Sequence, residues 1–158
     1  MKAKIKFSRF ATILTAVILV VLFVGCIATI GEKPMFFTLL AIYVILLFSG
    51  LMYGAAYIKA DSDHITMGSI IRSRKIPVRD IESVGLFQPA TGAVRVFASG
   101  GFMGFWGVFR ERGIGRYYAF YGKSSDCFLV RMKDGNKYVL GCEHPEAMVG
   151  YINAQLEA

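Results

Sequence analysis

The sequence predicts a membrane α-hairpin of two transmembrane helices, followed by a mainly-β domain of about seven strands with one C-terminal helix. Three observations predict this fold class. Two uncharged apolar runs lie within the first 58 residues, short strand-like runs with turns between them follow, and an amphipathic segment ends the chain. The 158 residues are 55% hydrophobic and 18% charged, whereas soluble domains are about 45–50% apolar and about 25% charged. We therefore expect part of the chain to lie in lipid.

The apolar runs, residues 10–30 and 35–58, contain no charged residue. A helix of roughly 20 apolar residues crosses the hydrocarbon core of a bilayer, and both runs reach that length. Because lipid offers the backbone no hydrogen-bond partner, each run is predicted to be a helix. The linker of residues 31–34 can only reverse the chain. The two helices are therefore expected to form an antiparallel hairpin with both termini on one side of the membrane.

Basic residues beside these runs predict the orientation of the hairpin. Four precede the first run and one follows the second, whereas the linker holds one basic and one acidic residue. The five flanking residues are Lys2, Lys4, Lys6, Arg9 and Lys59. Cytoplasmic flanks carry the excess of basic residues. We therefore expect a basic cytoplasmic tail at 1–9, the transmembrane hairpin at 10–58 and a cytoplasmic domain at 59–158.

Two alternatives for the first run fit its composition less well. A cleaved signal peptide has an apolar core of about 7–15 residues, which is shorter than this run. Residues 23–26 resemble a lipoprotein cleavage site ending at Cys26, but apolar residues continue to Ile30. We favour a buried membrane cysteine at this position.

A pair of small residues, Gly50 and Gly54, stands in the second run at the spacing that lets helices approach closely. The hairpin places this pair at the depth of Thr12, Thr15 and Ala16 in the first run. We expect the pair to pack the two helices of one chain against each other, with homodimerisation as the alternative.

From residue 57 the sequence alternates in the short runs typical of strands. The expected strands are 57–60, 64–71, 74–77, 81–87, 117–121, 127–132 and 137–141. The last two are joined through Asp134-Gly135, a strong hairpin signal. A two-residue turn would place Cys127 opposite Cys142, and a three-residue loop would shift this pairing by one residue. Both thiols are expected to stay reduced in the cytoplasm.

The chain ends in an expected amphipathic helix that begins at Pro145, a residue favoured in the first helical turn. Its apolar residues recur at spacings of three and four, and they are Met148, Tyr151, Ile152 and Leu156. This apolar face is expected to cover one end of the sheet.

The strand count and the terminal helix are the layout of a pleckstrin-homology-like barrel, and several motifs resemble those of bacterial pleckstrin-homology-like domains. Residues 76–84 resemble their IPxxDIxxV segment, and residues 100–117 resemble the glycine-aromatic stretch of one such family. The Asp-Gly hairpin and the Pro-Glu helix that follow in that family are similar to residues 129–140 and 145–152. The resemblance covers roughly residues 57–156 and implies a membrane-anchored protein of the bacterial inner membrane.

Residues with catalytic or metal-binding chemistry are few. Neither His64 nor His144 has a serine or cysteine nucleophile nearby in a recognisable arrangement. Cys142 and its sequence neighbours cannot converge on one ion, and the sequence has no second cluster. We expect no enzyme activity, no catalytic residue, no cofactor and no metal.

The best binding candidates are basic residues in two groups. The first group is Arg72, Arg74, Lys75 and Arg79, and the second is Arg110, Arg112 and Arg116. Lys59 and the Arg72–Arg74 stretch resemble the pattern by which some eukaryotic pleckstrin-homology domains hold inositol phosphates, and guanidinium groups fit phosphate well. Against this, Asp61 and Asp63 in the intervening turn would repel phosphate.

Segment 92–115 is long for a connection between strands, and it interleaves glycines with aromatic residues. Long loops in compact domains tend to be functional. We expect this loop to cap the barrel, to touch the membrane interface or to bind a partner. Trp106 is its candidate binding residue.

The sequence thus predicts a non-catalytic membrane-anchored adaptor that binds a protein partner at the cytoplasmic face. The alternative is recognition of anionic lipid headgroups by the basic strand. Of the net charge of +7, the tail carries +4 and the residues from 59 onward carry +3. Because the domain has only this modest charge, we do not expect nucleic acid as a partner.

Overall fold

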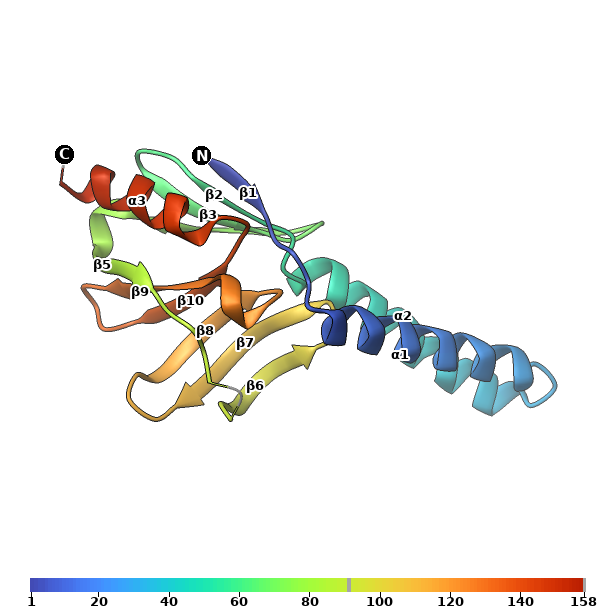
Figure 1. The fold of residues 1–158 in the computed structure, drawn as a ribbon. Coiled ribbons are helices and arrows are strands. Elements are labelled where there is room, and N and C mark those ends of the chain that lie inside the picture. The colour runs from blue at the N-terminus through green and yellow to red at the C-terminus, as the bar shows by residue number, and fades with distance from the viewer. Residues whose placement is uncertain (91, 158) are drawn as a thin grey trace.

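Two long helices project from a β domain (Figure 1). The computed structural model describes residues 1–90 and 92–157, so residue 158, the last of the expected cytoplasmic domain, lies outside the described residues. Helix α1 spans Arg9–Ala28 and helix α2 spans Lys33–Tyr53. The expected pair of apolar helices joined by a short turn is therefore confirmed.

The ends of the helices follow from local chemistry. The Ser8 side chain caps α1 by accepting a hydrogen bond from the Ala11 amide at 3.1 Å, and Pro34 stands in the first turn of α2, where its missing N–H has no partner to lose. Helix α2 ends at Tyr53, earlier than expected, because the chain turns at Gly54 into a strand.

Both helices are long and apolar enough to cross a membrane. Their buried residues are Ala11 and Cys26 in α1 and Gly50 in α2. Many of their large apolar side chains are exposed, among them Ile13, Val20 and Ile45, so the helices do not form the interior of a globular core. Apolar surface of this extent is suited to lipid rather than to water.

The domain contains two sheets. The first consists of β1 (Lys2–Lys4), β2 (Tyr57–Ala60), β3 (His64–Gly68) and β4 (Ser73–Pro77), in that order and all antiparallel. The second consists of β5 (Ile81–Leu86), β6 (Val94–Gly101), β7 (Gly104–Glu111), β8 (Gly115–Tyr121), β9 (Cys127–Met132) and β10 (Lys137–Gly141), in the order β5-β9-β10-β8-β7-β6. Strands β8 and β10 are parallel. Helix α3 spans Pro145–Leu156.

Strand β1 lies in the segment that we expected to be a basic tail. It pairs with β2, and Ile5 just beyond it is buried and donates its amide hydrogen bond to the Ala56 carbonyl at 3.0 Å. The Ser8 amide then bonds to the Gly122 carbonyl of the second sheet at 2.9 Å. The start of the chain is therefore part of the folded domain. Its run of lysines concealed a short edge strand, for which charged side chains are well suited.

Strands β6 and β7 form a long hairpin where a loop was predicted at residues 92–115. The register pairs Gly101 with Gly104 at the hairpin tip, and Met103 in the tip has a φ of 49°. The prediction was wrong because the many glycines indicated a loop. They lie instead at the tip and at close backbone approaches, whereas the aromatic and β-branched residues between them favour strands.

The main core lies between the two sheets and under α3. Its fully buried side chains include Ile58, Ile65, Phe128, Leu140, Met148 and Ile152. The last two confirm the expected apolar face of α3, which packs against β5 at one side of the domain. A second apolar cluster lies on the other face of the second sheet and includes Phe109, Tyr117 and Leu129.

The two sheets do not close into the predicted barrel. Strand β4 is an edge strand whose Ser73, Arg74 and Lys75 are exposed. Charged residues on an edge strand oppose further pairing. Helix α3 covers one side of the domain, and on the side of β4 a gap remains between the sheets. The candidate site lies in this gap.

Candidate binding cleft beside the helices

A pocket of about 460 Å³ lies between β4 and β8, next to the end of α2. Its lining residues are Met52, Tyr53, Met67, Ser69, Arg72, Ser73, Arg74, Tyr118 and Phe120. Three separate parts of the chain meet here: the last turn of α2, the β3–β4 hairpin and the middle of β8. We call this pocket the β4–β8 cleft.

Arg74 of β4 lines the cleft and contacts two tyrosines of the second sheet. Its guanidinium carbon lies 5.4 Å from the ring centre of Tyr118 and 5.6 Å from that of Tyr138, and its Nη2 donates a long hydrogen bond of 3.4 Å to the Tyr138 hydroxyl. The parallel register of β8 and β10 places the two tyrosines side by side. A cation above aromatic faces is attracted by them, so the two rings hold the charge of Arg74 at the cleft.

Arg72 occupies the end of the cleft nearest to α2. Its guanidinium carbon lies 5.8 Å from the ring centre of Tyr53, and Tyr53 in turn stacks on Trp106 with 5.5 Å between ring centres. The Trp106 Nε1 donates to the Phe102 carbonyl at 3.1 Å. This stack joins the end of α2 to the β6–β7 hairpin and holds Arg72 beside the helix.

The cleft carries uncompensated positive charge. Among the described residues, the ion pairs are Lys6–Glu143, Lys59–Asp61, Arg79–Asp80 and Lys123–Asp126, and none involves Arg72 or Arg74. Burial raises the pKa of the Tyr118 phenol, and Arg74 and Arg72 oppose this rise. Tyr118 therefore stays a neutral hydroxyl at physiological pH, and the cleft can attract an anion.

The other basic candidates separate into different places. Arg116 and Lys75 line two shallow hollows that both adjoin Arg74. Arg110 and Arg112 line a hollow at the far end of β7 together with Glu111. Arg79 is paired with Asp80. The structure thus brings Arg72, Arg74 and Trp106 together, and it distributes the remaining candidates over the surface of the domain.

Lys59 does not take the position that the inositol phosphate pattern would require. Its Nζ lies 2.9 Å from Asp61 Oδ2, and the residue does not line the cleft. Lys59 holds the pKa of the Asp61 carboxyl below its usual range, chiefly through their hydrogen bond. Lys59 and Asp61 therefore form a pair of their own outside the cleft.

Several cleft residues were missed at the level of sequence. Tyr53, Tyr118 and Tyr138 stand on three elements far apart in the chain, and each was read as part of a span or a strand. Ser69 was read as part of the strand 64–71, and Ser73 was placed between two expected strands. The one available signal was the alternation of β8, which places Tyr118 on the same face as buried Phe120.

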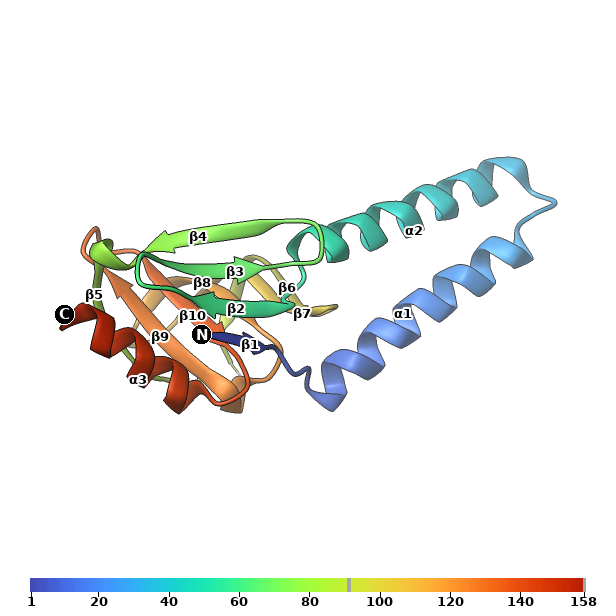
Figure 2. The same cartoon turned by 90° about the horizontal axis from the view of Figure 1, so that it is seen from above.

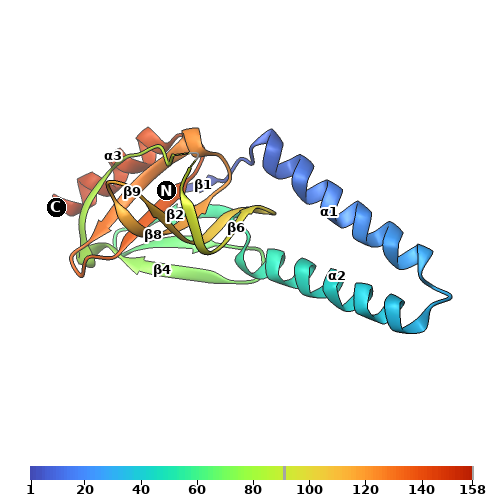
Figure 3. The ribbon, with the colours of Figure 1, turned by 90° about the horizontal axis from the view of Figure 1, so that it is seen from below.

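Gly50 and Gly54 face the tip of the β6–β7 hairpin, which lies between the diverging helices (Figure 2 and Figure 3). A Cβ at Gly50 would lie 3.0 Å from Phe102 Cε1 and would also meet Met103, and one at Gly54 would lie 3.1 Å from Met103 Cβ. The glycine pair therefore makes room for the hairpin tip, whereas we expected it to pack against α1. Homodimerisation through this pair stays a prediction.

Thr15 of α1 also contacts the tip of the β6–β7 hairpin. Its hydroxyl accepts a hydrogen bond from the Met103 amide at 2.9 Å and donates one to the Ala11 carbonyl at 2.7 Å. A tip amide that lies between apolar helices would otherwise have no partner, which is costly in lipid. The domain is thus joined to both helices through one hairpin.

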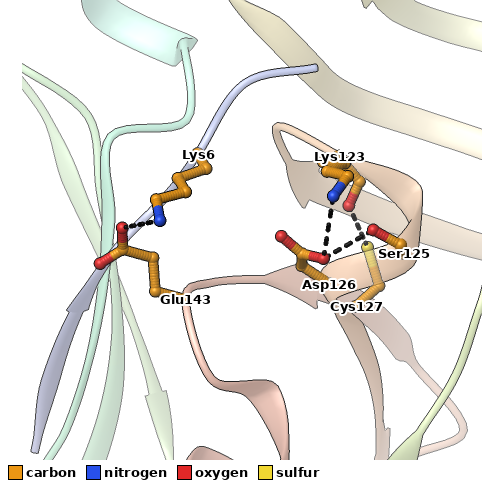
Figure 4. A network of polar contacts seen from close by, with 6 residues as sticks. All are labelled: Lys6, Lys123, Ser125, Asp126, Cys127 and Glu143. Carbon is orange, nitrogen blue, oxygen red and sulfur yellow. Dashed lines mark hydrogen bonds and ion pairs between the residues drawn. The ribbon is translucent and has the colours of Figure 1, made fainter.

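On the opposite side of the domain a polar network ties the start of the chain to the second sheet (Figure 4). Lys6 Nζ lies 3.0 Å from Glu143 Oε1, and the Glu143 amide donates to the Lys4 carbonyl at 2.9 Å. Nearby, Ser125 Oγ donates to Asp126 Oδ1 at 2.6 Å. The contacts of Glu143 secure the segment that includes β1.

The cysteines of the domain are buried and lie close in the sheet. The register pairs Cys127 with Gly141, one residue from Cys142, as expected for the longer of the two loops. The Cys127 thiol donates to the Lys123 carbonyl at 3.2 Å. Burial raises the pKa of both thiols, that of Cys142 to about 12.

We expect Cys142 to react slowly with iodoacetamide in the folded protein. The thiolate is the reactive form, and a pKa of about 12 in place of 9.0 leaves roughly one thousandth as much thiolate at pH 8. Mass spectrometry of peptides from labelled protein would measure the rate, with urea-unfolded protein as the reference. Equal rates in the folded and unfolded protein would contradict this prediction.

Among the described residues, no group of three or more His, Cys, Asp or Glu side chains could hold a metal ion. His144 precedes α3 in a left-handed conformation with a φ of 58°, and His64 begins β3. Both histidines lie at the ends of structural elements and away from the cleft.

A two-sheet domain, closed on one side by a C-terminal helix and carrying a basic cleft on the other, defines a pleckstrin-homology-like domain, here joined to two helices of membrane-spanning length. The chain belongs to the bacterial PH domain family, whose model matches residues 56–155. The match begins just before β2 and ends within α3, so it confirms the family resemblance. PH domains are generally binding modules. No curated protein and no solved structure matches the chain.

Proposed function

We propose that this protein is a non-catalytic, membrane-anchored module that binds the phosphate of an anionic lipid headgroup at the cytoplasmic face of the bacterial inner membrane. The observation that carries this proposal is the position of the β4–β8 cleft. Met52 and Tyr53, the last residues of a membrane-length helix, form one wall of it, and Arg72 and Arg74 form the other. A lipid headgroup is the anion that is present at this level.

The chemistry of the cleft supports a phosphate ligand. Arg72 and Arg74 have no acidic partner among the described residues, and guanidinium groups present the paired N–H donors that phosphate oxygens accept. Ser69 and Ser73 add hydroxyl donors to the lining. Tyr53 stands where the helix leaves the lipid, a position that tyrosine favours because its ring is amphipathic.

The distribution of charge supports the cytoplasmic side. The flanks of the two helices on the side of the domain carry Lys2, Lys4, Lys6, Arg9 and Lys59, whereas the opposite turn carries Glu32 and Lys33. Basic flanks stay on the cytoplasmic side. Anionic lipids of the cytoplasmic leaflet attract such residues, so the tail and the cleft face the same leaflet.

The protein-binding adaptor expected from the sequence is the second candidate. Strand β6 is an edge strand, and its Val94 and Val96 are exposed at 64% and 49%. An open edge with apolar side chains can pair with a strand of another protein. The lipid is preferred because its charge complements two unpaired arginines, whereas β6 offers no comparable indication of what would pair with it.

We expect full-length protein in detergent micelles to retain phosphatidylglycerol over phosphatidylethanolamine when both are supplied equally. Native mass spectrometry counts the lipid that stays bound. Arg72→Gln and Arg74→Gln are each expected to lower the retained phosphatidylglycerol about tenfold, because a charge-assisted hydrogen bond contributes about 1.5–3 kcal/mol. The proposal fails if the wild-type protein retains both lipids equally.

Arg112→Gln is the matched control. It removes the same charge from an arginine that lines the hollow at the far end of β7, away from the cleft. Its retention of phosphatidylglycerol is expected to equal that of the wild-type protein. An equal loss in Arg112→Gln and Arg74→Gln would mean that net charge, and not the cleft, holds the lipid.

A further inference from the structure

The turn between β3 and β4 lies against the end of helix α2. Its Ile71 amide donates a hydrogen bond to the Leu51 carbonyl at 3.2 Å, and the Ser69 amide closes the turn on the Arg72 carbonyl at 2.7 Å. Leu51 belongs to α2, which continues to Tyr53. The tip of this turn is therefore held at the level of the last turn of a membrane-length helix.

The side chains at the tip of this turn are apolar and exposed. Ile70 is 65% exposed and Ile71 is 53% exposed. Turn tips that face water favour glycine, asparagine, aspartate or serine, and two β-branched aliphatic residues in succession are unfavourable there. Against the rest of the described chain, both side chains keep more than half of their surface exposed.

The opposite turn of the same sheet has the contrasting composition. Between β2 and β3 the chain carries Asp61, Ser62 and Asp63, and this turn lies at the end of the sheet that points away from the helices (Figure 2). One end of the sheet is therefore acidic and remote from the helices, and the other is apolar and beside them. This asymmetry matches water at one end and lipid at the other.

The second sheet also presents an exposed apolar residue beside the helices. Phe97 of β6 is 81% exposed, and it lines a groove of about 340 Å³ together with Ile18 of α1 and Leu46 of α2. Ile18 and Leu46 both lie several residues from the ends of their helices. The domain therefore has apolar side chains beside both membrane-length helices.

We propose that Ile70 and Ile71 insert into the acyl chains of the leaflet on which the domain lies. The bilayer is the partner that fits, because the turn is bonded to a helix that itself enters lipid and because no charged residue precedes Arg72 at its tip. Insertion adds a contact beyond the two helices and fixes the angle of the domain against the membrane. It rests on the membrane position of α1 and α2 and does not require headgroup binding.

Tryptophan fluorescence of the full chain in vesicles tests this inference. Trp106 is the single tryptophan of the sequence, so Trp106→Phe combined with Ile70→Trp gives one reporter at the turn. Lipids brominated on their acyl chains quench a tryptophan that lies among them, and aqueous acrylamide quenches one in water. We expect strong quenching by the brominated lipids and weak quenching by acrylamide.

Ser62→Trp in the same Trp106→Phe background is the matched control, because it places the reporter in the opposite turn of the same sheet. We expect acrylamide to quench this reporter strongly and brominated lipids to quench it weakly. The inference is overturned if the Ile70→Trp and Ser62→Trp reporters respond alike. The unsubstituted protein supplies a second measurement. A lipid with a photoreactive acyl chain should crosslink to residues 70–71 as well as to the helices. Crosslinks confined to the helices would also overturn the inference.

Vesicles of zwitterionic lipid alone separate this inference from the proposed function. Insertion of isoleucine depends on apolar contact, so quenching by brominated lipid is expected to persist there and in Arg74→Gln, whereas retention of phosphatidylglycerol is lost in that variant. Loss of quenching in zwitterionic vesicles would overturn the inference. Equal retention of the two lipids with quenching intact would overturn the headgroup proposal alone.

Discussion

Gly107→Ala lowers the free energy of unfolding by about 2 to 6 kcal/mol, as the combined effect of backbone strain and overpacking. Gly107 lies in β7 with a φ of +111°, which residues with a Cβ rarely adopt, and an added Cβ would lie 2.7 Å from the Cα of Ala98. Because that neighbour is backbone of the paired strand, it cannot rotate away. Chemical denaturation of the full-length protein in detergent, followed by far-ultraviolet circular dichroism, measures the loss.

Gly113→Ala is the control that separates the two causes. Gly113 also has a left-handed φ, at +98°, but an added Cβ there meets nothing within 4 Å. Its substitution should cost about 1–3 kcal/mol, the strain alone. If Gly107→Ala is no more destabilising than Gly113→Ala, β6 does not lie against β7 as described.

Gly54→Val displaces the tip of the β6–β7 hairpin from its position between the helices. The added Cβ would meet the Gly50 carbonyl and would lie 3.3 Å from the Met103 carbonyl oxygen and 3.1 Å from its Cβ. The contacts with Met103 are relieved if the tip moves, and overpacking of this kind costs about 1–3 kcal/mol. Movement of the tip separates Trp106 from Tyr53, whose ring centres are 5.5 Å apart.

The emission of Trp106, the single tryptophan, reports this movement directly. We expect a shift of the emission maximum in Gly54→Val. Gly25→Val in α1 is the control, because its added Cβ has only Leu39 Cδ1 at 3.5 Å, an ordinary contact. Unchanged emission in Gly54→Val would show that the hairpin tip does not depend on the glycine pair.

The predicted elements of the fold were those with a strong local signal. The two helices follow from uncharged runs of sufficient length, α3 follows from its spaced apolar residues, and the β9–β10 hairpin follows from Asp134-Gly135. The strands β1, β6 and β7 were missed because lysine and glycine are common in tails and loops. Strand β1 forms by pairing with the distant β2, whereas β6 and β7 pair with each other in a hairpin, where aromatic and β-branched residues outweigh the glycines.

The candidate site was predicted in part. Arg72 and Arg74 were recognisable because they stand two residues apart in one short basic stretch, Arg72 just before β4 and Arg74 within it. Tyr53 and Tyr118 were not recognisable, since they reach the cleft from a helix and from another sheet. No spacing in the sequence links these residues to the arginines.

By itself the sequence determined that two segments suit lipid, that a β domain of the bacterial PH family follows, and that basic residues gather on the side of the domain. Each of these three conclusions depends on the composition, or on the short-range spacing of residues, within one segment of the chain. Only the tertiary structure decided that Gly50 and Gly54 receive Met103, that two sheets stay open beside β4, and that Ile70 and Ile71 lie next to α2. The physical reason is that these contacts join segments well separated in the chain, and their geometry arises only when the whole domain packs around its core.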